Sequence, residues 1–261
     1  MPRRGHTKAV YHVQKREVSA LLWGARNGTD PRFAFAFDAL ALMYVLGLRI
    51  GEVRLLRYEH KGVIDGQGLI RSVRVPTLKR TRRAATPDRP EAPLPPPPLI
   101  EVPVLAHFDW VRTAFDHTTR RGRAQVSKFL FPSPRDPTQP ISVRMVNEAF
   151  RVAARRGGVV AGATPHCLRH TVSTELYRHL RNDLEESEEI ALHACGRFLR
   201  HTKGKIWTGR GSDPYATTRI YVHATDDRYK VLNDWMPVIR GRAIVLPPLA
   251  PTVRAIGLGL A

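Results

Sequence analysis

The sequence predicts an α+β protein, in which a mostly helical domain carries a small antiparallel β-sheet. Apolar residues recur at helical spacing over much of the chain. Two short β-prone runs, 69–75 (LIRSVRV) and 100–104 (IEVPV), are bounded by residues that favour turns. Hydrophobic residues make up 43% of the 261 residues, which is sufficient for a substantial core.

The first two predicted helices meet at a glycine. Apolar residues recur every three or four positions from Phe33 to Leu46, and this helix is expected to end near Gly47. A second helix is expected over 49–60 (RIGEVRLLRYEH), with Val53 inward and with Arg49 and Glu52 on another face.

The two β-prone runs are expected to pair as an antiparallel hairpin. The segment between them, 77–98 (TLKRTRRAATPDRPEAPLPPPP), has a Pro-rich half at about 86–99 that cannot sustain ladder hydrogen bonds, so it is interpreted as an enlarged hairpin loop. The rest of the chain is predicted to be mostly helical, with helices at 107–118, 142–156, 165–180, 187–199 and 218–223. One domain is expected over 1–240, followed by a tail at 241–261 that is apolar but rich in Pro and Gly.

The charge favours a polyanionic partner. The chain has 42 Lys and Arg against 23 Asp and Glu, a net charge of +19, as is typical of nucleic-acid-binding proteins. Ribosomal, RNA-binding and membrane-surface proteins share this property. No apolar stretch reaches the roughly 18 to 20 residues needed to span a bilayer, and the two cysteines, Cys167 and Cys195, form no CxxC pair. A cytoplasmic protein with no membrane partner is expected, and the charge favours a nucleic acid as its polyanionic partner.

The segment TPHCLRHT at 164–171 has the chemistry of a phosphate site. Thr164 is a suitable N-cap and Pro165 a suitable first helical residue, which places His166 and Arg169 one turn apart near a helix N-terminus. Helix N–H groups and an arginine attract an anion, and a histidine can move a proton near neutral pH. The alternative is a capped helix with an ordinary surface histidine and arginine.

Two further segments complete a pattern: LGLRIGEVRLL at 46–56 and ATTRIYVH at 216–223. In this order, the G-x-R-x-x-E box, the H-x-L-R-H motif, a leucine-x-histidine and the T-T-x-x-Y-x-H segment resemble the tyrosine recombinase (phage integrase) family. The resemblance covers about 15–230. It implies the family's catalytic domain fold, shared with type IB topoisomerases.

The resemblance implies roles for four residues. Arg49 and Arg169 would hold the two non-bridging oxygens of the scissile phosphate, on which negative charge builds during the reaction. Tyr221 would attack phosphorus and form a 3′-phosphotyrosyl bond, and His166 would assist the proton movement that a phenol requires. Tyr215 and Tyr229 are nearby alternatives to Tyr221.

Lys79 resembles the family's β-hairpin lysine, which protonates the departing 5′ oxygen. Arginine hardly releases a proton, so the neighbouring Arg80, Arg82 and Arg83 are expected to bind DNA backbone phosphates instead. The Pro-rich insertion lies in this same hairpin.

His201, in FLRH at 198–201, matches the histidine of the family's L-G-H motif, a hydrogen-bond donor to phosphate. The sequence departs from that motif because Arg200 replaces the central glycine, and because the interval to Tyr221 is longer than usual. His193 and Trp207 are alternatives to His201. Supporting roles are expected for two residues, Glu52 (orienting Arg49) and His170.

These features imply a site-specific recombinase that cleaves and rejoins double-stranded DNA without a metal or other cofactor. The family implies a dimer on each site and a tetramer in synapsis, accessory DNA-binding proteins in some systems, and a C-terminal tail that docks in trans. With 48 residues before Arg49, no separate N-terminal DNA-binding domain is evident. Type IB topoisomerase-like relaxation and a non-catalytic DNA-binding module are alternatives. A zinc site from His166, His170, His193 and Cys195 is another.

Overall fold

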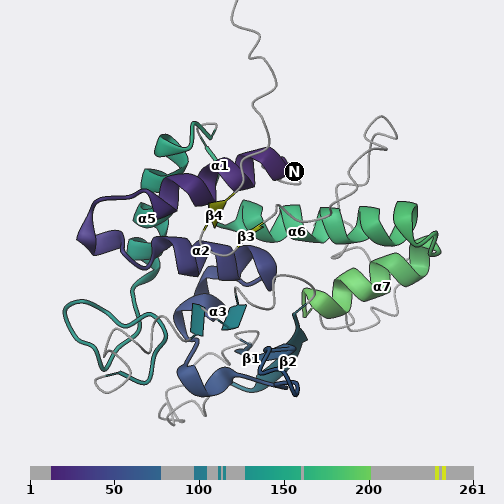
Figure 1. Cartoon of the computed structure of the whole chain (residues 1–261), viewed down its shortest axis with the longest axis horizontal. Helices are drawn as coiled ribbons and strands as arrows, with labels where there is room; N and C mark the ends of the chain where they lie inside the picture. Colours follow the sequence, from purple (N-terminus) through teal and green to yellow (C-terminus); the bar gives the residue numbers. More distant parts are fainter. Residues whose placement is uncertain are drawn as a thin grey trace, which may run out of the picture.

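A computed structural model describes the backbone of the residues at 13–77, 97–104, 111–112, 114–115, 127–159, 162–200, 239–240 and 243–244. Helices form most of this part of the chain, and a small sheet lies at one side of them (Figure 1). The predicted α+β class, mostly helical with a small antiparallel sheet, is confirmed.

Three helices form the main body: α1 (Lys15–Arg26), α2 (Ala36–Val45) and α5 (Val143–Arg156). Helices α1 and α5 approach each other closely at Gly24, which has no side chain. A Cβ placed there would lie only 2.3 Å from the Ala153 carbonyl oxygen. Figure 1 shows α1 and α2 side by side with α5 at their ends. The Ser142 side chain accepts a hydrogen bond from the Met145 N–H at the start of α5, which confirms the helix predicted at 142–156.

Helix α2 is enclosed by protein on nearly every side rather than on one stripe. Its residues from Ala39 to Val45 are fully buried, which fits a helix that is apolar all round. The predicted start at Phe33 is wrong, because Pro31–Phe33 form a separate 3₁₀ turn, η1. The predicted end is confirmed: Gly47 has a φ of +56°, and the Gly47 and Leu48 N–H groups return to the Tyr44 and Met43 carbonyls.

The helix predicted over 49–60 is divided into α3 (Ile50–Arg54) and the 3₁₀ turn η2 (Tyr58–His60). The break occurs because the chain pairs with a distant segment instead of continuing the helix. The Leu130 N–H donates to the Leu56 carbonyl at 2.8 Å, and Arg57 forms an antiparallel bridge with Phe129. Helical periodicity alone does not reveal such long-range pairing.

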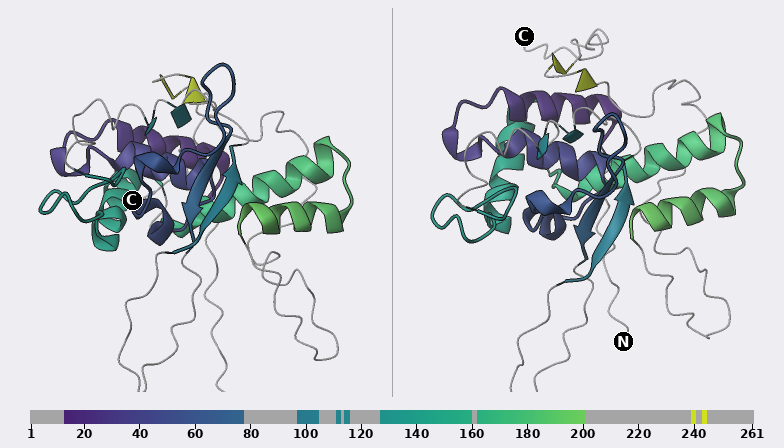
Figure 2. Two further views of the ribbon diagram at one scale, coloured as in Figure 1. Left: turned by 90° about the horizontal axis from the view of Figure 1, so that it is seen from below. Right: turned by 60° about the horizontal axis from the view of Figure 1, so that its bottom comes forward.

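The sheet is the predicted hairpin. Strand β1 (Ser72–Pro76) pairs antiparallel with β2 (Leu99–Pro103), with Val73 opposite Val102. The Thr77 N–H donates to the Pro98 carbonyl at 2.9 Å, so the ladder extends to the base of the long loop. In Figure 2 the two strands cross the molecule between the main helical body and the α6–α7 pair.

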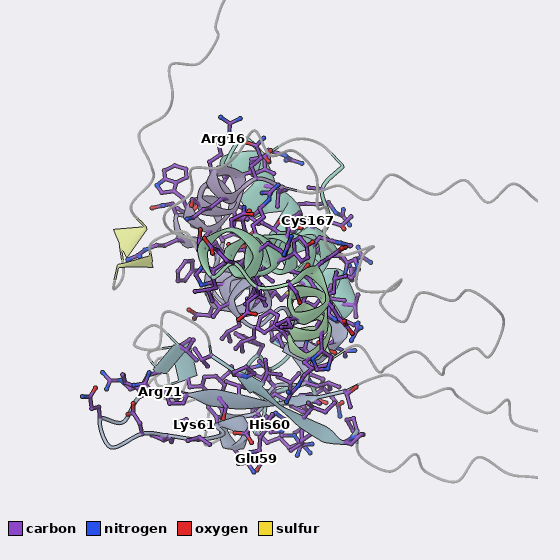
Figure 3. All side chains as sticks on the ribbon, turned by 90° about the vertical axis from the view of Figure 1, so that its right-hand side faces the viewer. Arg16, Glu59, His60, Lys61, Arg71 and Cys167 are labelled. Atoms are coloured by element: carbon purple, nitrogen blue, oxygen red, sulfur yellow. The ribbon has the colours of Figure 1, made fainter. Side chains whose placement is uncertain are left out.

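A side-on view separates the helical layer from the sheet layer (Figure 3). The side chains of Glu59, His60, Lys61 and Arg71 lie at the sheet, whereas Arg16 and Cys167 belong to the helical layer. His60 is buried, and this burial together with Arg57 lowers its pKa to about 4.

Helix α6 (His166–Arg178) continues into a π-helical turn, η4 (His179–Asp183), and the chain returns along α7 (Glu188–Phe198). These elements form a helical hairpin that extends from the main body (Figure 1). The Ser187 side chain caps α7 by accepting from the Ile190 N–H, which confirms the helix predicted at 187–199. The helix predicted at 165–180 is also confirmed, although it begins one residue later, at His166.

Some predicted segments lie wholly or partly outside the described residues. Of the helix predicted at 107–118, residues 111–112 and 114–115 are described and are helical, and the helix predicted at 218–223 is outside the described part. Ile239–Arg240 (β3) and Ala243–Ile244 (β4) form a short antiparallel pair, with β4 beside α1. Within the described residues, no helix has the length and apolar character to cross a membrane.

Candidate functional site

The glycine turn after α2 places Arg49. Because Gly47 adopts the left-handed conformation, the chain reverses within two residues and Arg49 becomes the N-cap of α3. A Cβ on Gly47 would lie 2.9 Å from the Phe198 ring, so the turn also packs tightly against the end of α7. The Arg49 side chain remains partly accessible, with 23% of it exposed.

Glu52 is the carboxylate at the centre of the site, and its side chain is 0% exposed. Its Oε2 accepts from the Arg49 backbone N–H at 2.8 Å, and its Oε1 accepts from Arg49 Nη1 at 2.9 Å. The same carboxylate therefore caps α3 and holds the Arg49 guanidinium. This is the contact through which Glu52 was expected to orient Arg49.

Arg169 reaches the same place from α6. Its side chain is fully buried; Nη1 donates to the Gly47 carbonyl, Nη2 donates to the Leu199 carbonyl, and Nη1 lies 3.9 Å from Glu52 Oε2. The fold thus brings together Arg49 and Arg169, which are far apart in the sequence.

A third guanidinium, from Arg200, completes the cluster. Its Nη2 donates to the Gly47 carbonyl and to Glu52 Oε2, both at 2.7 Å, and its Nη1 donates to the Phe198 carbonyl at 3.0 Å. The cluster of Arg49, Glu52, Arg169 and Arg200 is called the arginine cluster below.

The charges of the arginine cluster are unbalanced. Three guanidiniums and one carboxylate give +3 − 1 = +2. Burial by itself would raise the pKa of Glu52, but Arg200 first, then the Arg49 N–H and Arg169, lower it below its ordinary value. Glu52 is therefore ionised at neutral pH, and the excess positive charge favours an anion.

His166 lies at the start of α6, beside the arginine cluster, and reaches solvent. Partial burial of its ring and the nearby Arg169 and Arg49 guanidiniums lower the pKa of His166, so its imidazole is neutral at pH 7. The ring meets the buried His170 ring edge-on, with centroids 4.7 Å apart. His170 thus packs under His166 and supports its position.

Several predicted site residues lie outside the described part of the chain: Lys79, Arg80, Arg82, Arg83, His201 and Tyr221. The residues shortly before Lys79 and directly before His201 are described. β1 packs against α3 and its ladder ends at Thr77, two residues before Lys79, and Arg200 directly precedes His201. Strand β1, which contacts α3, and Arg200, a member of the arginine cluster, thus precede Lys79 and His201 in the chain.

The described residues also bear on the proposed zinc ligands. His193 is exposed on α7, and Cys195 is buried with its thiol donating to the Ser173 carbonyl. Among the described side chains, no group of three or more His, Cys, Asp and Glu residues is arranged to hold a metal ion.

Sequence comparison identifies the family. A profile described as the phage integrase family matches residues 13–193. The chain belongs to the phage integrase family. The matched residues include Arg49, His166 and Arg169 and end before Arg200 and Tyr221. No curated protein sequence matches the chain significantly.

Solved tyrosine recombinases share the fold. XerA recombinase is 21% identical with a TM-score of 0.53, over 86% of this chain and 62% of that one. XerH, in a post-cleavage complex with its palindromic difH substrate, is 13% identical with a TM-score of 0.57, over 84% and 51%. A lambda integrase dimer bound to a COC′ core site is 17% identical with a TM-score of 0.50, over 89% and 53%. This chain therefore spans about half to three fifths of the length of these relatives.

Sequence reasoning missed the position of Arg200. The signal was present, since Arg200 replaces the glycine of the L-G-H motif, but it was interpreted as a departure from the family. The structure gives the reason for a glycine there: Arg200 follows α7 with a φ of +55°, in the left-handed region that glycine favours.

Proposed function

We propose that this chain is a site-specific DNA recombinase that cleaves and rejoins duplex DNA through a 3′-phosphotyrosyl intermediate on Tyr221. The observation that carries the proposal is the convergence of Arg49 and Arg169 on Glu52 and the Gly47 carbonyl. Membership of the phage integrase family supports it.

The two arginines fit a phosphoryl-transfer site. As a nucleophile approaches phosphorus, negative charge is spread over the non-bridging oxygens, and guanidiniums that are already in place stabilise that charge. Arg49 is held by Glu52 and Arg169 by two carbonyls, so neither side chain has to be ordered when DNA binds. The net charge of +2 favours the phosphate diester over water.

The remaining steps require proton transfers. In the proposed reaction the Tyr221 oxygen bonds to phosphorus, the bond to the 5′ oxygen breaks, and the tyrosine proton passes to His166. The lowered pKa of His166 leaves its imidazole neutral and able to accept that proton. Lys79 would protonate the 5′ oxygen, and His201 would donate a hydrogen bond to the phosphate.

Duplex DNA is the proposed partner, with Arg80, Arg82 and Arg83 bound to its backbone. XerH and lambda integrase were solved with DNA, the latter as a dimer on a core site. We propose the same assembly here, a dimer on each site and a tetramer in synapsis, with accessory DNA-binding proteins in some reactions.

The tail at 241–261 would dock on a neighbouring protomer, and its deletion should then weaken assembly on DNA. Unchanged assembly would contradict this.

A nicked suicide duplex tests the mechanism. The protein is incubated with the duplex in the presence of a chelator and without nucleotide, and the products are separated on a denaturing gel. A covalent protein–DNA adduct is expected from the native chain and from Tyr215→Phe, but not from Tyr221→Phe. An adduct that survives Tyr221→Phe would refute the assigned nucleophile.

The same preparation separates the alternatives. Relaxation of supercoiled DNA that lacks the recombination site would favour type IB topoisomerase-like activity. Tight DNA binding without an adduct on the protein's own target would favour a non-catalytic DNA-binding module. Activity that requires added zinc would instead support a metal site.

A further inference from the structure

Arg200 occupies a backbone position that suits glycine. It follows α7 with a φ of +55°, where a side chain is strained and glycine is not. The strain persists because the surrounding contacts hold the residue in place. The Arg200 side chain is buried in spite of this backbone conformation, so its contacts offset the strain.

The side chain connects the end of α7 to the glycine turn. Nη1 donates to the Leu46 carbonyl at 3.2 Å and Nη2 to the Gly47 carbonyl at 2.7 Å, so Arg200 binds two carbonyls of the turn that follows α2. Gly47 is also the acceptor for Arg169. The Arg200 guanidinium therefore fixes the Gly47 carbonyl, and this carbonyl in turn orients the Arg169 guanidinium.

Arg200 also supplies charge to Glu52. Without it, the buried carboxylate would be balanced mainly by Arg49, the arginine that is partly exposed to the site. With Arg200 at 2.7 Å from Oε2, Glu52 has a second, fully buried partner. The net charge rises from +1 to +2, and in a buried site this difference acts strongly on an anion.

We propose that Arg200 is a positioning residue that neutralises Glu52 and fixes the Gly47 carbonyl. The positive charge of Arg49 and Arg169 is then less offset by Glu52, and both guanidiniums stay oriented toward the phosphate. The inference rests on the proposed function for its catalytic consequence, but not for its effect on anion binding. Arg200 acts through the arginine cluster and does not itself touch the phosphate.

Arg200→Gly is the main test. It removes the guanidinium and supplies the residue that the backbone conformation favours, so the change isolates the side chain. At saturating suicide duplex, adduct formation should be about 10- to 100-fold slower, the loss expected for one charge-assisted contact. DNA affinity should change less than about threefold, and Arg200→Lys should restore part of the rate because it keeps the charge.

A double-mutant cycle separates positioning from a merely structural role. In a Glu52→Gln background, measured below its lowered Tm, Arg200 has no carboxylate to neutralise and keeps only its contacts with the Leu46 and Gly47 carbonyls. Adding Arg200→Gly should therefore slow the reaction by a smaller factor there than in the native background. The matched control is Arg197→Ala, which removes an exposed charge three residues away on α7 and should leave the rate unchanged. An equal loss in both backgrounds, or an Arg200→Gly rate within about twofold of native, would overturn the inference.

A second measurement does not depend on cleavage. Inorganic phosphate should raise the Tm of the native chain above that in chloride of equal ionic strength, and Arg200→Gly should lose at least about half of this shift, unlike Arg197→Ala. An equal phosphate shift in Arg200→Gly and native chain would refute the role of Arg200. If phosphate behaves as expected but the native chain forms no adduct, the proposed function fails and the role of Arg200 stands.

Discussion

Replacement of Glu52 by glutamine should destabilise the protein strongly. The substitution keeps the shape of the side chain but removes the charge that faces Arg49, Arg169 and Arg200. One side-chain oxygen becomes an NH₂ group, which would confront N–H donors from Arg49 or Arg200. Two of these arginines are fully buried and would lose their carboxylate partner.

The magnitude follows from this burial. Breaking a buried ion pair by removing one partner costs about 3–5 kcal/mol, because the remaining charge is left in a medium of low polarity. At about 2–4 °C per kcal/mol for a chain of this size, the Tm should fall by about 6–20 °C. The exposed pair of Arg57 and Glu59, with Glu59 67% exposed, offers a matched control, and Glu59→Gln should change the Tm little.

The pH dependence gives a second check. The folded-state pKa of Glu52 is lowered, so its contribution is present above the ordinary carboxyl pKa and is lost as the pH falls through the folded value. Thermal melts of both proteins from pH 7 down to about pH 3 should therefore show a Tm difference that is largest at neutral pH and shrinks in acid. A difference below about 2 °C at pH 7, or one that grows in acid, would refute the account of Glu52 as the ionised centre of the cluster.

Three further predictions follow from the same structure. Gly47→Ala should lower the free energy of unfolding by about 2–3 kcal/mol, because alanine is strained at φ +56° and its Cβ would lie 2.9 Å from the Phe198 ring. Gly66→Ala is the control and should be tolerated, because a Cβ there would have nothing within 4 Å. Urea unfolding of the two variants compares these free energies. The lowered pKa of His166 means that adduct formation should persist below pH 6.5 before protonation stops it, and a pH–rate profile whose acid limb has a midpoint above 6.5 would contradict this. Cys167 and Cys195 are buried, which raises the pKa of each thiol to about 12. A thiol reagent should therefore modify neither cysteine until the protein unfolds, as measured by mass spectrometry. Rapid labelling of the native chain would contradict this.

Local sequence patterns predicted elements whose signals are local. Ser142 and Ser187 cap α5 and α7 where the sequence indicated, and Gly47 ends α2. The pairing of β1 with β2 was predictable as well, because two alternating runs flank one loop. These features depend on residues a few positions apart, which a sequence displays directly.

The break between α3 and η2 was not predictable in this way. It depends on Leu56 and Arg57 pairing with Phe129 and Leu130, more than 70 positions later. Periodicity favours one helix there, and the tertiary contact overrides it.

By itself, the sequence determined which residue types could serve a phosphate site, and their order along the chain identified the family pattern. Only the tertiary structure decided that Glu52 binds both Arg49 and Arg200 and lies near Arg169. The physical reason is that the cluster forms where the ends of α2 and α7 and the start of α6 meet. A side chain's partners there depend on a left-handed turn and on burial, neither of which is visible in the order of the residues.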